Sequence, residues 1–170
     1  FKTSCYWLFK KELQQIGLKG IYDKEGKEVI YSKDKIYALG MKELEFNHPK
    51  DSRFEYIGPV LYSPIPDYEG NLSYNKNQKY VLVTMGTHLK FMKQELIKNI
   101  QLLAQSYPEL EFHITMGEDN KNLLKEVKNI KVVNYISYDK YLDNYDYVIH
   151  HGGTGIMYEC IKRAIPSMVF

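Results

Sequence analysis

The segment from Asp146 to Phe170, reading DYVIHHGGTGIMYECIKRAIPSMVF, constrains the fold of this chain more than any other stretch. A short apolar run ends in two histidines, a glycine-rich turn follows, and a helical pattern of apolar residues comes next. After Pro166 a second apolar run begins. This order predicts a strand, a loop, a helix and a second strand, which is the repeating unit of α/β domains with parallel strands.

The loop of this unit has the features of an anion site. Glycine lets the backbone approach a ligand closely, and the first N–H groups of a helix have no acceptor within the helix. A phosphate placed there accepts hydrogen bonds from those N–H groups. The loop residues that we expect to contact such an anion are His151, Gly152, Gly153, Thr154 and Gly155.

An acidic residue follows the loop at helical spacing. Glu159 comes four residues after Gly155 and therefore shares its helical face. A carboxylate beside an open glycine can accept hydrogen bonds from the two hydroxyls of a vicinal diol. Hydrogen-bond donors for a phosphate, together with an acceptor for a diol, indicate a nucleotide or a nucleotide-sugar as the ligand.

The chain after Lys79 alternates between strand and helix patterns. Continuous apolar runs separated by helices indicate parallel strands that are covered on both faces. The prediction is a Rossmann-like, doubly wound α/β sheet, in which ligands bind outside the carboxyl ends of the strands. The expected strands are Tyr80 to Met85, Phe112 to Thr115, Ile130 to Val133 and Tyr147 to His150, and the expected helices are Phe91 to Ala104, Leu123 to Val127 and Tyr138 to Leu142.

Other strand ends supply further candidate residues. Gly86 and Thr87 follow the first strand, and the Thr87 hydroxyl is equally well explained as a phosphate donor or as the cap of the next helix. Tyr135 follows another strand and is a candidate for stacking on a base. Because the chain has 16 tyrosines, one tyrosine is a weak signal, and the simpler interpretation is that Tyr135 closes the core edge. Met116-Gly117 ends a third strand. The three strand ends with glycine or small polar residues, at Gly86-Thr87, Met116-Gly117 and His150 to Gly155, are expected to converge on one crevice.

The part before this domain is less regular. A helical stripe runs from Tyr6 to Ile16, and short strand patterns occur at Ile36 to Leu39 and Phe54 to Ile57. A tract rich in proline and glycine follows, which predicts a linker. We therefore expect a helical and irregular appendage at 1–58 as the tail of another domain, a linker at 59–78 and a nucleotide-binding domain, incomplete at its end, at 79–170.

Several classes of protein are disfavoured. The net charge of +2, with both signs interspersed, argues against nucleic-acid and membrane-surface binding. Two distant cysteines do not form a disulfide framework and fit a reducing, cytoplasmic compartment, and no apolar run is long enough for a transmembrane helix. His150 and His151 lack further metal ligands at a recognisable spacing, so no metal is expected. The loop also lacks the third glycine of a dinucleotide fingerprint, which leaves a nicotinamide-binding domain with only its fold class in support.

Four landmarks, in this order, carry a family resemblance. They are FEYIGPV at Phe54 to Val60, VLVTMGT at Val81 to Thr87, VVNYISY before a short helix, and HHGGTGIMYE at His150 to Glu159 followed by AIPSMVF. Together they cover about Ile36 to Phe170 and resemble the C-terminal, donor-binding half of GT-B glycosyltransferases. These enzymes use UDP-sugars or other NDP-sugars, and the resemblance is greatest to the bacterial macrolide-type branch. The start without Met and the stop at a strand suggest a fragment of a longer enzyme.

The resemblance implies a role for each candidate residue. His151 and the loop amides would bind the donor diphosphate, Glu159 the ribose hydroxyls and Thr87 a phosphate or the sugar edge. The Ile136 backbone would contact the base edge, with Tyr135 stacked on the base. Ile156 stands where the family often has Ser or Thr, and Tyr135, Ser137 and Tyr138 replace the usual Trp, Pro and Gln, so the base identity is open.

The implied reaction is metal-independent sugar transfer with inversion from an NDP-sugar, most simply a UDP-sugar, to a hydroxyl of a small-molecule or lipid acceptor. The nucleotide-sugar is then a substrate and no cofactor is expected. The catalytic base and a hydrophobic acceptor site would lie in an N-terminal domain outside this chain, so the chain alone is expected to be inactive. The alternative is a nucleotide-sugar-binding subunit that acts with a separate acceptor-binding partner chain.

Overall fold

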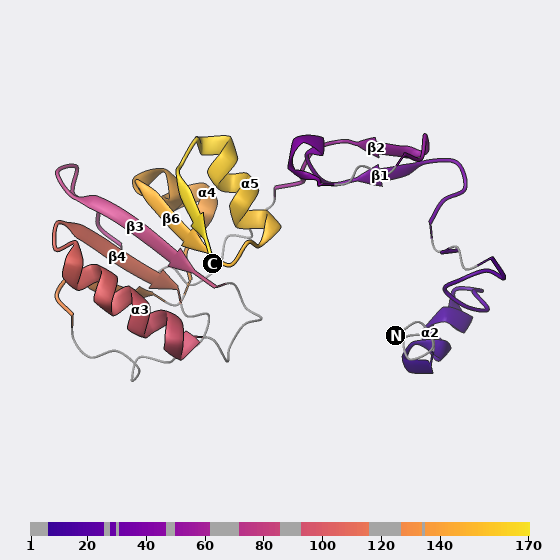
Figure 1. The fold of residues 1–170 in the computed structure, drawn as a ribbon, viewed down its shortest axis with the longest axis horizontal. Helices are drawn as coiled ribbons and strands as arrows, with labels where there is room; N and C mark the ends of the chain where they lie inside the picture. Colours follow the sequence, from indigo (N-terminus) through magenta and orange to yellow (C-terminus); the bar gives the residue numbers. More distant parts are fainter. Residues whose placement is uncertain are drawn as a thin grey trace. The chain divides into compact units, whose positions relative to one another are not determined.

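The computed structural model describes residues 7–25, 28–29, 31–46, 50–61, 72–85, 93–115, 127–133 and 135–170. The chain divides into two compact units, Phe1–Val60 and Leu61–Phe170, which are called unit 1 and unit 2 below. Figure 1 shows the helices and strands of both units. No helix in the described part of the chain is long and apolar enough to cross a membrane.

In its described residues, unit 1 contains one short helix and a two-stranded parallel sheet. Helix α2 spans Lys10–Gln15, strand β1 spans Ile36–Ala38, and β2 spans Phe54–Tyr56. A 3-10 turn, η1, covers Lys42–Leu44. These elements confirm the expected helix and the two expected strands.

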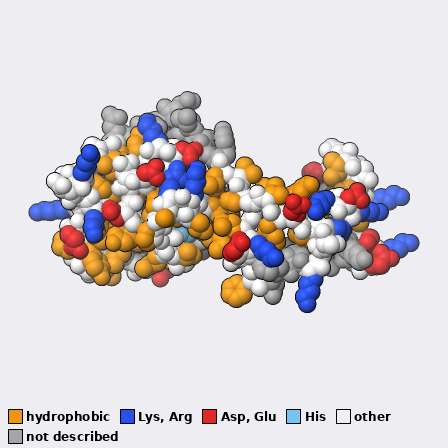
Figure 2. Space-filling view, turned by 90° about the horizontal axis from the view of Figure 1, so that it is seen from above, with side chains coloured by type: hydrophobic (Ala, Val, Ile, Leu, Met, Phe, Trp, Pro, Cys, Tyr) orange, Lys and Arg blue, Asp and Glu red, His pale blue; other side chains and the backbone are white. Residues whose placement is uncertain are grey.

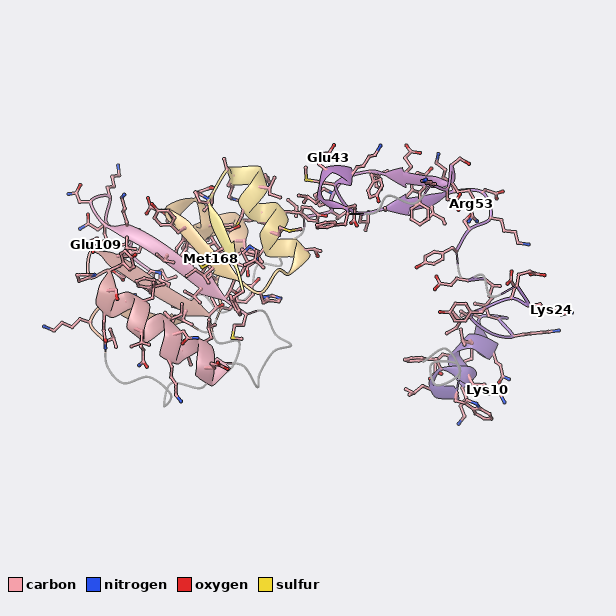
Figure 3. All side chains as sticks on the ribbon, in the orientation of Figure 1. Lys10, Lys24, Glu43, Arg53, Glu109 and Met168 are labelled. Atoms are coloured by element: carbon pink, nitrogen blue, oxygen red, sulfur yellow. The ribbon has the colours of Figure 1, made fainter. Side chains whose placement is uncertain are left out.

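The two strands of unit 1 are joined by charged side chains as well as by backbone pairing. Figure 3 labels Arg53 beside the two strands. Arg53 contacts the Asp51 carboxylate through Nε and Nη2, and its Nη1 donates to the Ser32 carbonyl at 3.1 Å. Lys35 Nζ lies 2.8 Å from Glu55 Oε2. Because Arg53 holds it, the Asp51 carboxyl has a pKa lowered to about 2.

Unit 2 is built on a five-stranded sheet with the order β5-β4-β3-β6-β7. Every neighbouring pair is parallel. The strands are β3 at Lys79–Thr84, β4 at Leu110–Thr115, β5 at Ile130–Val133, β6 at Tyr147–His150 and β7 at Ser167–Val169. This sheet confirms the predicted fold class.

Helices cover both faces of the sheet. Helix α3, Lys93–Ser106, lies along one face of the sheet (Figure 1). It buries Ile97, Ile100 and Ala104 against residues of β3 and β4. Helix α5, Thr154–Arg163, buries Ile156 and Cys160 on the opposite face. The same face receives Leu142 and the short elements α4, Tyr138–Tyr141, and η4, Leu142–Asn144. Residues of β3 alternate between the two faces, which explains its continuous apolar sequence.

The strand order places a topological switch between β3 and β6. From β3 the chain adds β4 and then β5 on one side, and it later adds β6 and β7 on the other side. Ligands of doubly wound sheets bind in the crevice at such a switch, outside the carboxyl ends of the strands. The glycine-rich loop begins at the carboxyl end of β6, so it lies at this position.

Most of the expected elements agree with the structure to within two residues. The expected short helix at Leu123 to Val127 lies outside the described residues except for Val127, which is not helical. Gly86, Thr87, Met116 and Gly117 also lie outside them, as do Phe91 and Met92 at the start of the expected first helix. The central part of the expected linker, 62–71, is likewise not described.

Candidate functional site

The N-terminus of α5 directly follows the glycine-rich loop. Gly153 occupies the cap position in an extended conformation, and no side chain among the described residues caps the helix. Met157 N–H donates to the Gly153 carbonyl at 3.1 Å, which closes the first helical turn. The N–H groups of the residues before Met157 have no acceptor within the helix, so they are suited to bind an anion.

The space beside this helix end is open. Thr154 and Gly155 are exposed, and a Cβ atom added to Gly155 would meet nothing within 4 Å. Ile156 turns the other way and is buried in the core with Leu82 and Val148. The first turn of α5 therefore presents backbone to solvent on one side and anchors the helix on the other.

Two glycines of the loop lie close to side chains, and at Gly152 the backbone conformation also favours glycine. Gly152 has a φ of +79°, a backbone conformation that residues with a side chain rarely adopt. A Cβ atom at this position would lie 3.2 Å from Val169 Cγ1. At Gly153 a Cβ would lie 2.8 Å from Nε2 of His151, so the imidazole ring packs directly over this glycine. His151, Gly152, Gly153, Thr154 and Gly155 thus lie at or beside the N-terminus of α5. Their role in binding an anion stays a prediction.

Glu159 is buried and paired, whereas a carboxylate that is ready to accept hydrogen bonds from a ribose would be exposed. The residue is 3% exposed, and its Oε2 forms an ion pair with Arg163 Nη1 one helical turn later. Arg163 also contacts Asp143 at 2.9 Å and Asp139 at 3.5 Å, so it joins α5 to α4 and η4. Arg163 was not among the residues predicted from the sequence, although its spacing of four residues from Glu159 is a signal of a helical ion pair. The ribose role of Glu159 stays a prediction.

Other candidate residues lie after β5 and β3. Tyr135 is 43% exposed just after β5, whereas Ile136 is buried in the core. Thr84 at the end of β3 is buried, and its hydroxyl lies 3.4 Å from the Tyr138 hydroxyl. Thr84 pairs in register with His150, so the hydroxyl of β3 and the imidazole of β6 come from neighbouring strand ends. The roles of Tyr135 and Ile136 in base binding stay predictions.

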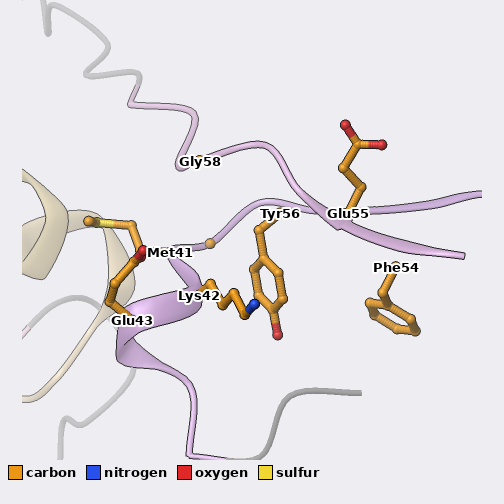
Figure 4. Close-up of a pocket in the computed structure, with 8 residues that line it drawn as sticks. Met41, Lys42, Glu43, Phe54, Glu55, Tyr56 and Gly58 are labelled. Atoms are coloured by element: carbon orange, nitrogen blue, oxygen red, sulfur yellow. The ribbon is translucent and has the colours of Figure 1, made fainter. Parts of the chain in front are cut away.

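Three hollows are found on the surfaces of the two units. One, of about 510 Å³ in unit 1, is lined by η1 and β2 residues; Figure 4 shows Glu55 pointing to one side of β2, and Phe54 and Tyr56 to the other. A second, of about 730 Å³, lies over β3, β6 and β7 beside α3, and a third, of about 630 Å³, is lined by Tyr74, Tyr80 and Lys131 among others. None of these three includes a loop residue in its lining.

The described part of the chain shows neither a metal site nor an exposed thiol. Within the described ranges, no group of three or more His, Cys, Asp or Glu side chains is arranged to hold a metal ion. Cys160 is a free thiol buried in the core, and burial raises its pKa to about 11. A thiol with this pKa stays protonated near neutral pH, so Cys160 is a core residue.

Comparison with known proteins gives two relatives at equal identity. The chain is 24% identical over 145 residues to UDP-glucosyltransferase A1 from Starmerella bombicola, covering 80% of this chain and 30% of that protein. It is also 24% identical over 138 residues to Endoribonuclease YbeY from Buchnera aphidicola, covering 76% of this chain and 86% of that protein. At this identity neither relative decides the family.

Solved structures share the fold of both units. The glycotransferase of kitacinnamycin matches with a TM-score of 0.67 and 22% identity, over 98% of this chain and 43% of that chain. The spinosyn rhamnosyltransferase SpnG, solved with thymidine diphosphate, matches with a TM-score of 0.61 and 18% identity, over 94% of this chain and 40% of that one. The present chain therefore spans less than half of the length of these glycosyltransferases.

A family model decides the assignment. The sequence model described as "Glycosyltransferase family 28 C-terminal domain" matches residues 80–170, which include the whole five-stranded sheet except Lys79 and contain the loop and α5. The match agrees with the resemblance carried by the four sequence landmarks. Because this model covers more than half of the chain, the protein belongs to glycosyltransferase family 28, and unit 2 carries the C-terminal domain of that family.

Proposed function

We propose that unit 2 binds the nucleotide-sugar donor of an inverting glycosyltransferase, and that the loop from His151 to Gly155 holds the donor diphosphate. The observation that carries this proposal is the open N-terminus of α5 at the topological switch of the sheet, with free backbone N–H groups and no side-chain cap among the described residues. The helix dipole adds a favourable field for a negative charge at that end.

The proposed reaction places the chemistry at the anomeric carbon of the donor sugar. An acceptor hydroxyl oxygen attacks this carbon, the bond from the carbon to the diphosphate oxygen breaks, and the hydroxyl proton passes to a base outside this chain. Negative charge grows on the departing nucleoside diphosphate. His151 and the N–H groups of α5 stabilise this charge, and they speed the reaction to the extent that they bind it more tightly than the charge of the bound donor.

The donor class follows from the family and from its relatives. UDP-glucosyltransferase A1 is named for a UDP-sugar, whereas SpnG was solved with thymidine diphosphate, so both UDP and TDP are reasonable ligands. The acceptor is proposed to be a hydrophobic small molecule or lipid with a free hydroxyl. A cytoplasmic location is part of the proposal and fits the free thiol of Cys160.

A second candidate is a donor-binding subunit that acts with a separate acceptor-binding chain. Its support comes from unit 1, where several large apolar side chains are exposed, including Trp7 at 67%, Leu8 at 73% and Phe46 at 105%. Figure 2 shows hydrophobic side chains on the surface of this unit. A surface of this kind fits a further domain or a partner chain. Transferase activity that appears only after a second polypeptide is added would favour the subunit; activity of one longer polypeptide would favour the single enzyme.

Calorimetric titration of the chain with UDP, TDP and NAD tests the donor site. We expect a nucleoside diphosphate to bind better than NAD, and His151→Ala to weaken its binding roughly tenfold or more, because a hydrogen bond to a charged group is lost. Lys162→Ala is the control, since Lys162 is exposed at the opposite end of α5. Equal binding of NAD and UDP, or an unchanged affinity in His151→Ala, would contradict the proposal. If Glu159 binds the ribose, 2′,3′-dideoxy-UDP should bind more weakly than UDP.

A further inference from the structure

His150 precedes the candidate diphosphate loop and is buried where His151 is partly exposed. It is the last residue of β6, its side chain is 0% exposed, and it pairs in register with Thr84 on one side and Val169 on the other. Its imidazole therefore lies beneath the loop, within the sheet and core, and has no direct access to a ligand in solvent.

One hydrogen bond connects this imidazole to the loop backbone. The Gly152 N–H donates to His150 Nδ1 at 3.1 Å. Gly152 is also the loop residue with φ of +79°, and a Cβ atom added to it would lie 3.2 Å from Val169 Cγ1. The imidazole of His150 therefore holds the loop at Gly152, the loop residue that has a positive φ.

The hydrogen bond fixes the protonation state of the ring. A nitrogen that accepts from an N–H carries no proton, so the neutral His150 ring has its proton on Nε2. Burial lowers the pKa of His150, and the neighbouring His151 lowers it further, so the neutral form is favoured. Nε2 is buried and has no hydrogen-bond partner among the described residues.

An unpartnered buried donor is costly, and most buried polar groups in proteins are satisfied. A phenylalanine of similar shape would avoid this cost at His150. What histidine supplies in exchange is the acceptor at Nδ1, and this acceptor serves only the Gly152 N–H in the described structure.

We propose that His150 is a positioning residue, and that its neutral imidazole holds the loop in the shape that grips a diphosphate. This inference rests on the proposed function of the loop. With Gly152 held, Gly153 stays under the His151 ring and the first turn of α5 stays open. Without the Nδ1 acceptor the turn loses its only side-chain hydrogen bond among the described contacts, and the diphosphate-binding amides lose their alignment.

Substitutions at His150 separate the acceptor from the bulk of the ring. His150→Phe keeps a ring and removes both nitrogens. His150→Asn places an amide oxygen near the position of Nδ1, whereas His150→Gln places its polar group near the position of Nε2. His113→Phe is the matched control, because His113 is also a fully buried strand histidine and contacts Tyr145 and Glu111, away from the loop.

The measurement is the ratio of UDP affinity to UMP affinity, taken on the full chain by calorimetry. We expect His150→Phe to lower this ratio about tenfold, the effect of one lost hydrogen bond, and His150→Gln to behave in the same way. His150→Asn should restore most of the ratio. His113→Phe should lower the thermal stability and leave the ratio of UDP affinity to UMP affinity unchanged. If His150 had a merely structural role, His150→Phe would give the same result as this control.

Amide exchange at Gly152 provides a readout without ligand. Protection of this amide in the wild type and in His150→Asn, and its loss in His150→Phe, is expected. A folded His150→Phe with an unchanged UDP/UMP ratio, or with a protected Gly152 amide, would overturn the inference while the donor site stands. A wild-type chain that binds no nucleoside diphosphate would overturn the proposed function and this inference together.

Discussion

Among single residues, a few buried charged and polar side chains matter most for the stability of unit 2. Arg163 is the centre of one such group, because its guanidinium contacts Glu159, Asp143 and Asp139. The Arg163 side chain is 11% exposed and that of Glu159 is 5% exposed, so the pair is shielded from solvent. Removing one partner of a shielded pair leaves an uncompensated charge in the core.

We therefore expect Arg163→Met to destabilise the chain by about 3–5 kcal/mol. The double variant Glu159→Gln/Arg163→Met should lose less stability than Arg163→Met alone, because no buried charge remains. Urea unfolding of the single and double variants measures this coupling. Arg53→Met, at the solvent-exposed pair with Asp51, is the control and should change the stability far less. Additive effects of the two substitutions in unit 2 would contradict the interpretation.

A second buried group surrounds His113. Nδ1 of this ring lies 2.8 Å from the Tyr145 hydroxyl, Nε2 lies 3.0 Å from Glu111 Oε1, and the Tyr145 and Tyr74 hydroxyls are 2.9 Å apart. With His113 neutral, Nε2–H donates to Glu111, Tyr145 donates to Nδ1 and Tyr74 donates to Tyr145. Burial chiefly lowers the pKa of His113, the bond to Glu111 opposes this, and Lys131 lowers it slightly.

This lowered pKa predicts how stability changes with pH. The unfolded chain has an ordinary histidine pKa of 6.5 and binds a proton more readily than the folded chain does. Stability should therefore be full above pH 6.5 and fall as the pH drops below it, towards the lowered folded value. Urea midpoints between pH 7.5 and pH 5.5 measure the slope, to which His150 also contributes. His113→Phe should reduce the slope; an equal or steeper slope would show that other groups cause it.

At the scale of elements, α5 is fixed at both ends by backbone conformation. Its carboxyl end closes with Ala164 in the left-handed conformation, at φ 53° and ψ 36°. Ile165 N–H then donates to the Cys160 carbonyl at 2.9 Å, and Ala164 N–H donates to the Ile161 carbonyl at 3.1 Å. This is a Schellman-type helix end, a position where glycine is usual and a side chain is strained.

Ala164→Gly should consequently stabilise the chain by about 0.5–1 kcal/mol, because relief of left-handed strain exceeds the added freedom of the unfolded chain. The same substitution should have the opposite effect at Ala104, which is buried within α3. Ala104→Gly should destabilise the chain by about 1 kcal/mol or more. Urea unfolding of both variants checks the pair. A destabilised Ala164→Gly would mean that the helix end is not strained.

The elements of unit 2 were largely predictable because burial on both faces of a parallel sheet leaves a direct mark on the sequence. Val81, Leu82 and Val83 are all buried, and such continuous apolar runs located β3 and β6. The loop was predictable from its glycines, because that signal also lies in neighbouring residues of the sequence. The tyrosine and histidine group was not, because Tyr74 and Tyr145 are 71 residues apart and only the tertiary fold joins them. Nor did the pattern indicate that His150 would accept from Gly152.

At the scale of the whole chain, the two units differ in how much apolar surface they bury. Leu13 is the buried hydrophobic residue of unit 1 in the described part of the chain, whereas unit 2 has two core clusters, one on each face of its sheet. Amides that exchange only on global unfolding are found in well-packed strands, and poorly packed segments open locally at lower cost.

Hydrogen exchange of the intact chain should therefore divide at the boundary between the units. We expect the amides of β3, β4 and β6 to exchange slowest and those of β1 and β2 to exchange orders of magnitude faster, because little buried surface opposes their opening. Addition of UDP should slow exchange further at His150 to Met157, where the proposed diphosphate site lies, and leave β1 and β2 unchanged. Equal protection of both units would show that unit 1 is stabilised by contacts other than its own core. Protection that UDP adds over β4 and α3, and not at the start of α5, would place the nucleotide at another part of the sheet and argue against the loop as its binding site.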